Sequence, residues 1–371
     1  MNIMLEIDGS YHEGGGQIVR TALGLSVLTG IPFICKDIRK GRKDSGLKAQ
    51  HLTAIQAFEK ISDSKCEGAE LGSTQITFMP KPIKKYTLEI DIGTAGSISL
   101  LLQSLLPALV FADKKICLKI IGGTDVAWAM PIDYLQNLLA PQLVRFANIK
   151  IIQTKRGYYP KGNGLVELKI TPKVKRNSSN SFDDFVMEIR KNCNPFALEK
   201  QNKILIIRGI SHASNDLQNA KVAERQASAA KNVLQQLKCP ILINSGYYNT
   251  LSTGSGIMAY AIFGNSEEEE DLKNPIRLGA DVLGEKGKKA EIVGEECAKR
   301  LIKEIESKGA VDEHLVDNLL PFLALVGGKI CATEISSHAK TNIYAIEKFL
   351  GPTFSIKDNC ISVVHNKVEK I

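Results

Sequence analysis

The sequence lacks segments that would carry a chain into or across a membrane. No apolar run is long enough to span a bilayer, and the first residues lead into Glu6 and Asp8 rather than into the apolar centre of a signal peptide. The eight cysteines include no C-x-x-C pair, the spacing typical of zinc sites and redox dithiols. We therefore expect a soluble, cytoplasmic protein without a membrane partner, in which most cysteines are buried thiols.

Two common nucleotide-binding patterns are also missing. The chain has neither the P-loop pattern G-x-x-x-x-G-K-[ST] nor the dinucleotide pattern G-x-G-x-x-G. His12, His51, His212 and His365 show no metal-ligand spacing with one another, so we assign no metal site to them. Any nucleotide site in this chain must therefore be built differently.

The charge that is present is moderately basic. The 371 residues include 48 Lys and Arg against 40 Asp and Glu, which gives 48 − 40 = +8. This excess suits a polyanionic partner, and a solvated basic surface explains it equally well. A chain of this length can bury a large core and suggests two or three units.

One histidine lies at a position that suits a catalytic residue. Residues 329–334 have the pattern of a short apolar strand, and Ile343 and Ile346 fall at helical spacing before Gly351, which is placed to end a helix. His338 therefore falls in the turn entering this helix, beside backbone N–H groups that attract phosphate. Neutral imidazole can attack a phosphorus atom, so a covalent histidine–nucleotide intermediate is reasonable. This segment alone favours the alternative of an ordinary polar turn residue.

Glycines and cations mark the first part of the chain. The triple glycine 14–16 stands between a strand and a helix start, where successive N–H groups can bind an anion, although glycines also serve tight turns. Glu13 and Arg20 flank it. Arg39 and Arg42 follow in a basic loop before the next helix. Such a loop can bind phosphates, although charge runs are more often solvated.

The chain repeats its order of elements. Residues 86–172 follow the same succession of strands and helices as the first unit, and the matching turns at Asp8 and Asp91 are 91 − 8 = 83 residues apart. Two successive βαβαββ units explain this better than chance. A third unit is interrupted, and its opening strand has no clear position in the pattern.

The interruption has strands and a helix of its own, between a polar and an acidic run. We therefore predict an α/β (α+β) fold in which three βαβαββ repeats form a large domain, made of residues 1–180 and 276–371. Residues 181–275 are predicted to form an inserted small α/β domain. Helices expected at 291–307 and 312–325 are assigned to the third repeat.

Eight segments in order resemble the RNA 3′-terminal phosphate cyclases: EGGGQIVRTALGLS, IRKGRKDSGLKAQHLTA, DIGTAGS, GGTD, RGYYPKGNG, VAER, DEHLVDNLL and SSHAKTN. They span nearly the whole chain, which makes the resemblance specific. It implies the same three-repeat fold with an inserted domain. It also implies that ATP adenylylates a histidine with loss of pyrophosphate, that the adenylyl group passes to an RNA 3′-phosphate, and that the neighbouring 2′-hydroxyl then closes a 2′,3′-cyclic phosphate with release of AMP.

By motif position, the resemblance implies that His338 is the adenylylated residue. ATP is expected to contact eight further residues: Glu13, Arg20, Gln103, His314, Leu315, Val316, Asp317 and Asn318. Glu13 is also expected to hold a divalent metal, Mg or Mn. An RNA 3′-phosphate end is expected at Arg39, Arg42, Gln50, Arg156 and Tyr159. Many relatives have an aromatic residue in place of His314 and glutamine in place of Asn318.

Two other classes of function remain open at this point. A non-catalytic cyclase-like protein of ribosome biogenesis would keep the fold and bind RNA or protein, and the histidine of the SSHAKTN motif separates it from an enzyme. An enolpyruvyl-type transferase shares the repeat, but His338 and the basic excess count against it. The oligomeric state is not predicted.

Overall fold

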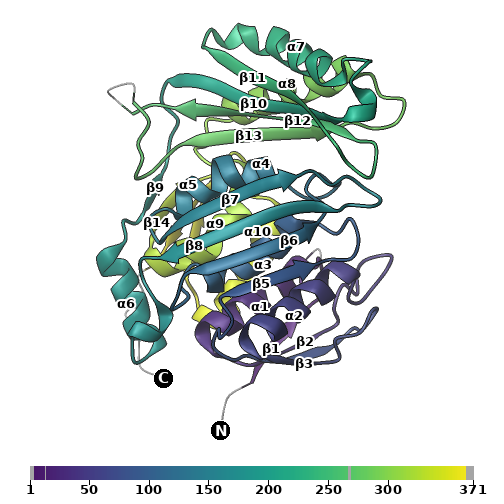
Figure 1. Cartoon of the computed structure of the whole chain (residues 1–371). Coiled ribbons are helices and arrows are strands. Elements are labelled where there is room, and N and C mark those ends of the chain that lie inside the picture. The colour runs from purple at the N-terminus through teal and green to yellow at the C-terminus, as the bar shows by residue number, and fades with distance from the viewer. Residues whose placement is uncertain (1–3, 13, 266–268, 365–371) are drawn as a thin grey trace.

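The computed structural model describes residues 4–12, 14–265 and 269–364, so Glu13 and His365 lie outside the described residues. Strands and helices alternate through the chain, and the predicted α/β (α+β) class is confirmed (Figure 1). The described strands form four sheets of four strands each. None of the helices in the described part of the chain is long and apolar enough to cross a membrane.

Three of the sheets share one strand order. The first contains β1 (Leu5–Asp8), β2 (Phe33–Lys36), β4 (Ile76–Met79) and β3 (Lys65–Glu67), in this spatial order. The second contains β5 (Thr87–Asp91), β6 (Ile116–Gly122), β8 (Gly164–Pro172) and β7 (Ala147–Lys155). The third contains β9 (Phe196–Leu198), β14 (Gly328–Cys331), β16 (Cys360–Val363) and β15 (Phe354–Lys357).

In each of these sheets the first two strands are parallel and the other two pairs are antiparallel. We infer that the three sheets are copies of one unit. The strand β9 then opens the third copy, and its partner β14 follows only after the inserted residues. A three-residue strand at the end of a helix gives little periodic signal, which is why the sequence did not locate it.

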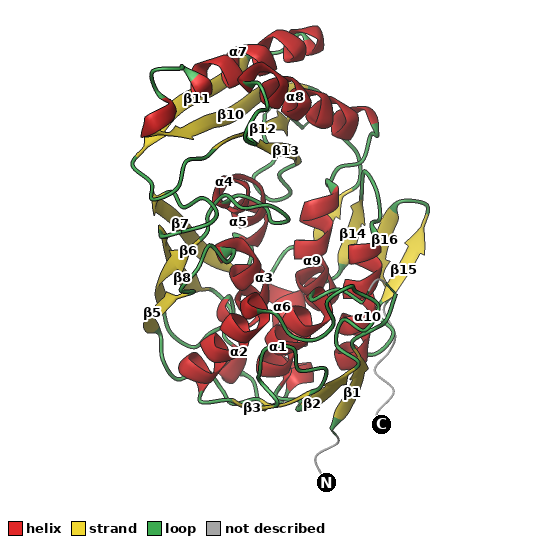
Figure 2. Ribbon diagram, turned by 90° about the vertical axis from the view of Figure 1, so that its right-hand side faces the viewer, coloured by secondary structure: helices red, strands yellow, loops and turns green. Residues whose placement is uncertain are grey.

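The helices of the first two units are α1 (Gln17–Thr29), α2 (Ala49–Ser62), α3 (Ile98–Leu109), α4 (Ile132–Tyr134), a π-helical turn at Leu135–Leu139, and α5 (Ala140–Leu143). The third has α9 (Glu313–Val326) and α10 (Ser337–Leu350), and α6 (Phe182–Asn192) precedes its first strand. In Figure 2 the three sheets surround a central group of helices that includes α1, α3, α9 and α10. Every residue of α1 is buried, because α3 and α10 pack on it from two sides.

The fourth sheet forms a separate layer at the top of Figure 2. Its order is β11 (Ile241–Tyr248), β10 (Ile204–Ser214), β12 (Ser255–Phe263) and β13 (Arg277–Leu283). Two helices, α7 (Val222–Leu234) and α8 (Ala290–Glu306), cover its outer face and share a hydrophobic core with it. This core differs in extent from the expected 181–275 segment, since it includes α8 and excludes α6 and β9.

We propose that the inserted unit comprises residues 203–306. The chain enters and leaves it at neighbouring points, because Gln201 Nε2 donates to the backbone oxygen of Gly309 at 2.7 Å. Replacing residues 203–306 by a short linker should leave a core that unfolds cooperatively. Removing residues 181–275 instead should give a core that does not unfold cooperatively. This deletion takes β9 from the third sheet, and it removes most of the sheet on which α8 packs. Equal behaviour of the two deletions would contradict this boundary.

One pair of cysteines is bonded. Cys331 and Cys360 are register partners on β14 and β16 and form a disulfide, whereas the other six described cysteines are free thiols. Scattered spacing in the sequence gave no indication of this pair.

Candidate active site

One buried amide joins the second turns of three central helices. Asn342 of α10 accepts a hydrogen bond from Thr21 Oγ1 of α1 at 2.7 Å, and its Nδ2 donates to the backbone oxygen of Asp317 in α9 at 2.6 Å. The amino-terminal ends of α1, α9 and α10 therefore lie within about one helical turn of a common junction. Helix amino-terminal ends carry unpaired N–H groups and partial positive charge, so this junction favours phosphate.

His338 is exposed in the first turn of α10, just after the N-cap Ser336, whose hydroxyl accepts from the N–H of Ala339 at 3.1 Å. The sequence placed His338 in the preceding turn, and the helix begins one residue earlier than it. His338 precedes Asn342 by four residues, which puts both side chains on the same face of α10. This histidine therefore stands over the junction of the three helices.

Arg20 and Asp317 form the charged part of this junction. Both side chains are buried, and Arg20 Nε donates to Gln103 Oε1 at 3.3 Å. Burial raises the pKa of Asp317 to about 7, and the nearby His314 and Arg20 only partly offset this. Burial likewise lowers the pKa of Arg20 to about 10. The side chains of Asp317 and Gln17 interact, and Gln17 lowers the pKa of Asp317, but neither Asp317 Oδ1 nor Gln17 Nε2 makes a hydrogen bond of normal geometry. Both buried atoms can therefore still accept a ligand.

The glycine turn is shaped by a buried histidine. His51 Nδ1 accepts from the N–H of Lys48 at 2.9 Å, which leaves Nε2 directed at Gly16. A Cβ added to Gly16 would lie 1.8 Å from His51 Nε2. Burial first, and then the nearby Arg20 and Arg39, lower the pKa of His51 to about 3, so the ring is neutral. The turn before α1 therefore needs glycine at position 16 because of this contact.

The basic loop lies beside the same turn. Arg39 adopts a left-handed backbone conformation with φ of 57° and donates from Nη2 to the backbone oxygen of Asp44 at 3.3 Å. Its Nε is buried without a partner. Burial and the neighbouring Arg42 lower the pKa of Arg39. Arg42 is exposed, and Gln50 is half-buried in the first turn of α2. Arg39 also acts electrostatically on Arg20 and His51, so loop and junction form one basic region.

The residues expected to contact the adenylate, 314–318, fall into a buried group and an accessible group. The side chains of Leu315 and Val316 are fully buried in the hydrophobic core, so only their backbone atoms remain for a ligand. Asn318 donates from Nδ2 to the backbone oxygen of His314 at 2.7 Å, which occupies that amide within the helix. His314 is exposed, and its ring stands edge-on to Tyr134. His314 is thus the exposed side chain of this segment, and Asp317 is the buried one whose Oδ1 makes no hydrogen bond of normal geometry.

Arg156 is placed differently from the expected RNA contact. It is 3% exposed, and its Nη1 and Nη2 each lie 2.8 Å from a carboxylate, of Asp125 and Asp133 respectively. Its charge is therefore already neutralised inside the protein, and we no longer expect it to bind RNA. Tyr159 is 75% exposed, as an RNA contact requires.

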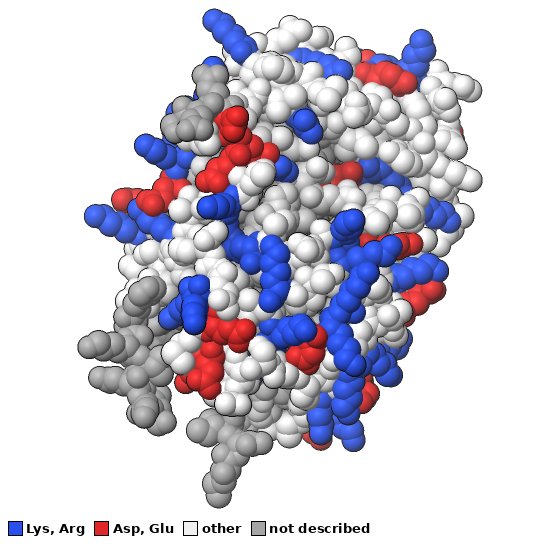
Figure 3. Space-filling model, turned by 60° about the vertical axis from the view of Figure 1, so that its left-hand side comes forward, with Lys and Arg blue, Asp and Glu red and all other residues white. Residues whose placement is uncertain are grey.

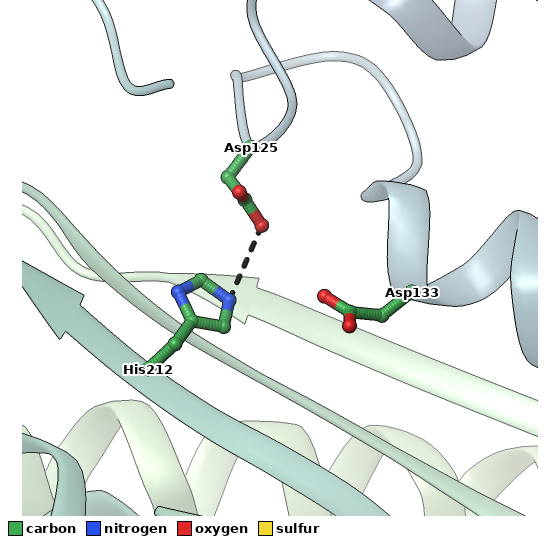
Figure 4. A group of neighbouring side chains, drawn as sticks. All are labelled: Asp125, Asp133 and His212. Atoms are coloured by element: carbon green, nitrogen blue, oxygen red, sulfur yellow. Dashed lines mark ion pairs between the residues drawn. The ribbon is translucent and has the colours of Figure 1, made fainter. Parts of the chain in front are cut away.

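Asp125, Asp133 and His212 have donor atoms within 4.8 Å of one another, a separation that suits a metal ion (Figure 4). The guanidinium of Arg156 bonds to both carboxylates, however, and so fills the position of a cation. His212 Nε2 lies 3.2 Å from Asp125 Oδ1, and burial lowers its pKa to about 3. This neutral imidazole ties strand β10 of the small unit to the large one.

Two residues of the junction were missed from the sequence. Asn342 interrupts the apolar face of its helix within the SSHAKTN segment, which is the signal that could have identified it. His51 follows Gln50 in the first turn of α2, and nothing local indicates that its ring faces the glycine turn.

The basic excess is not gathered in one patch on the face shown in Figure 3, where Asp and Glu lie between the Lys and Arg side chains.

Comparison with known proteins identifies the family of this chain. Residues 11–356 match the family model described as RNA 3'-terminal phosphate cyclase. The chain is 44% identical to the "RNA 3'-terminal phosphate cyclase" of Pyrococcus furiosus, 42% to that of Pyrococcus abyssi and 41% to that of Thermococcus sibiricus. Each alignment covers 95% of this chain and 95% of the relative. The chain belongs to the RNA 3′-terminal phosphate cyclase family, which is a family of enzymes.

Proposed function

We propose that this protein uses ATP to convert the 3′-terminal phosphate of an RNA into a 2′,3′-cyclic phosphodiester. The observation that carries the proposal is that His338 lies one helical turn before Asn342, whose side chain bonds to α1 and α9 near their amino-terminal ends, and that α1 also carries the buried Arg20. A nucleophilic imidazole next to phosphate-binding N–H groups suits nucleotidyl transfer. Membership of the family supports the choice of RNA as substrate.

The reaction then has three balanced steps. A neutral ring nitrogen of His338 attacks the α-phosphorus of ATP, the bond to the β,γ-diphosphate breaks, and pyrophosphate leaves. An oxygen of the RNA 3′-phosphate next attacks the same phosphorus and releases the imidazole, which gives an RNA 3′-adenylate. The neighbouring 2′-hydroxyl finally loses its proton, attacks the 3′-phosphorus and displaces AMP.

The side chains around the junction have matching roles. Arg20 and Arg39 neutralise the phosphates, because both guanidiniums are wholly or partly withdrawn from water, where charge–charge attraction is stronger. The Gly14–Gly16 turn brings backbone N–H groups close to the triphosphate, and Gln103 holds Arg20 in place. His314 at the start of α9 offers a ring for the adenine, while Arg42 and Gln50 receive the RNA end.

Asp317 is the described carboxylate of the junction that could contribute to a divalent metal site. It has a buried oxygen without a hydrogen bond of normal geometry and a pKa near 7, and a bound cation would favour its ionised form. We propose Glu13 and Asp317 as the carboxylates that hold Mg or Mn. Such an ion supplies positive charge that stabilises the phosphate being transferred.

A terminal-phosphate assay tests the activity. An RNA with a radioactive 3′-phosphate should become resistant to phosphatase when incubated with the protein, ATP and Mg²⁺ or Mn²⁺. The same RNA with a 2′-deoxy terminal nucleotide should stay sensitive, because it lacks the attacking hydroxyl. Sensitivity of both RNAs under every metal would contradict the proposal and favour a protein that binds RNA without cyclising it.

A further inference from the structure

The single tryptophan of the chain is almost completely exposed. Trp128 has 98% of its surface open to solvent and adopts a left-handed backbone conformation with φ of 66°. A bulky residue rarely takes this conformation, which is energetically unfavourable and tends to occur at functional positions. Large aromatic side chains usually bury most of their surface. The loop therefore keeps this indole in water at an energetic cost.

The loop that carries Trp128 is fixed at both ends. Asp125 before it and Asp133 after it both bond to the guanidinium of Arg156. Arg156 also leads into the loop of Tyr159, whose ring is 75% exposed. One buried arginine thus anchors the two loops that carry these exposed aromatic residues.

Both rings line a single cleft between the large part of the molecule and the small unit. The cleft has a volume of 620 Å³, and its lining includes Trp128, Tyr159, Gln50, Thr253 and Glu285. Thr253 and Glu285 come from the small unit. Gln50 directly precedes His51, whose ring contacts the glycine turn, so one end of the cleft reaches the basic region of Arg39.

We propose that this cleft takes the unpaired bases that precede the 3′-phosphate of a single-stranded RNA, with Trp128 and Tyr159 stacking on them. The inference rests on the proposed function, since the cations beside Gln50 receive the terminal phosphate. Stacking on aromatic rings is the usual way in which proteins hold unpaired bases, and it tolerates any sequence. Flat rings at a cleft that opens toward cations suit a chain of bases and phosphates better than an apolar peptide.

Because Trp128 is the only tryptophan, its fluorescence reports on this cleft alone. A single-stranded oligonucleotide with a 3′-phosphate, added without ATP, should quench the emission in a saturable manner. A blunt duplex of the same sequence should quench it far less, because its bases are already stacked. Binding of a labelled single strand, followed by anisotropy, should weaken about 5- to 150-fold in Trp128→Ala and much less in Trp128→Phe, which keeps a ring. Met187→Ala is the matched control, because Met187 is an exposed apolar residue on α6.

The outcomes separate this inference from the proposed function. Unchanged RNA affinity in Trp128→Ala, or equal quenching by single strand and duplex, would overturn the stacking role even if the protein cyclises RNA normally. Labelling of the protein by ATP needs no RNA and should be the same in Trp128→Ala and wild type. Loss of that labelling in wild type would count against the proposed function instead.

Discussion

Two buried polar clusters in this molecule differ in how completely their groups are paired. In the cluster of Arg156, both terminal nitrogens bond to carboxylates, His212 bonds to Asp125 and Tyr158, and only Arg156 Nε lacks a partner. In the cluster of Arg20, four buried polar atoms lack a hydrogen bond of normal geometry: Asp317 Oδ1, Gln17 Nε2, Arg39 Nε and His51 Nε2. Buried polar groups are normally satisfied. We infer from this difference that the first cluster holds the units together and that the second accepts a ligand.

The largest effect that tests this contrast is on stability. Replacing Arg156 by methionine should leave Asp125 and Asp133 buried without their cation, and we expect a loss of about 3 to 5 kcal/mol in the free energy of unfolding. Lys169→Ala, which breaks the exposed pair with Glu167, should cost less than about 1 kcal/mol. Denaturant unfolding measures both. A loss in Arg156→Met no larger than that in Lys169→Ala would mean that this cluster does not hold the units together.

A second effect concerns the turn before α1. Gly16→Ala would force a methyl group against the ring of His51, and we expect roughly 2 to 3 kcal/mol of destabilisation together with loss of ATP labelling. Gly41→Ala is the matched control in the basic loop, because a Cβ there meets nothing within 4 Å. His51→Ala in the same chain should restore part of the stability of Gly16→Ala. If the double variant were no more stable than Gly16→Ala alone, the contact with His51 would not be the reason why position 16 needs glycine.

The smallest effect is a pH dependence at Asp317. Since burial raises its pKa from 3.8 to about 7, the folded protein binds more protons than the unfolded chain between these values. The contribution of Asp317 to stability is therefore complete below about pH 4, and it is lost as the pH rises through 7. Asp317→Asn removes this loss, so the stability of the variant relative to wild type should increase by about 1 to 2 kcal/mol from pH 5.5 to pH 7. A constant difference across this range would show that Asp317 is ionised without difficulty.

The sequence predicted what depends on local pattern. The alternation of strands and helices, the glycine turn and the helix after His338 follow from periodicity and capping residues, and the structure places them close to the expected positions. The amphipathic pattern of α8 was equally clear, but such a pattern does not say which sheet a helix covers. The extent of the inserted unit was for that reason not predictable.

Contacts between distant segments were also beyond sequence reasoning. Arg156 has the residue type of a phosphate ligand, and only the positions of Asp125 and Asp133 in space show that its charge is already used. Asn342 and Thr21 come from opposite ends of the chain, and no spacing rule connects them. The exposed Trp128 shows the same limit, because a lone tryptophan in a sequence is normally expected inside.

The central claim is that His338 carries the adenylyl group, and labelling with ATP tests it most directly. Wild-type protein incubated with α-labelled ATP and Mg²⁺ or Mn²⁺ should retain label through a denaturing gel, and the bond should break in acid and survive alkali, as a phosphoramidate does. His338→Ala should retain none while unfolding like wild type, because an exposed residue contributes little packing. Lys348→Ala, exposed near the other end of α10, should label fully. Label of wild-type intensity in His338→Ala would contradict the account.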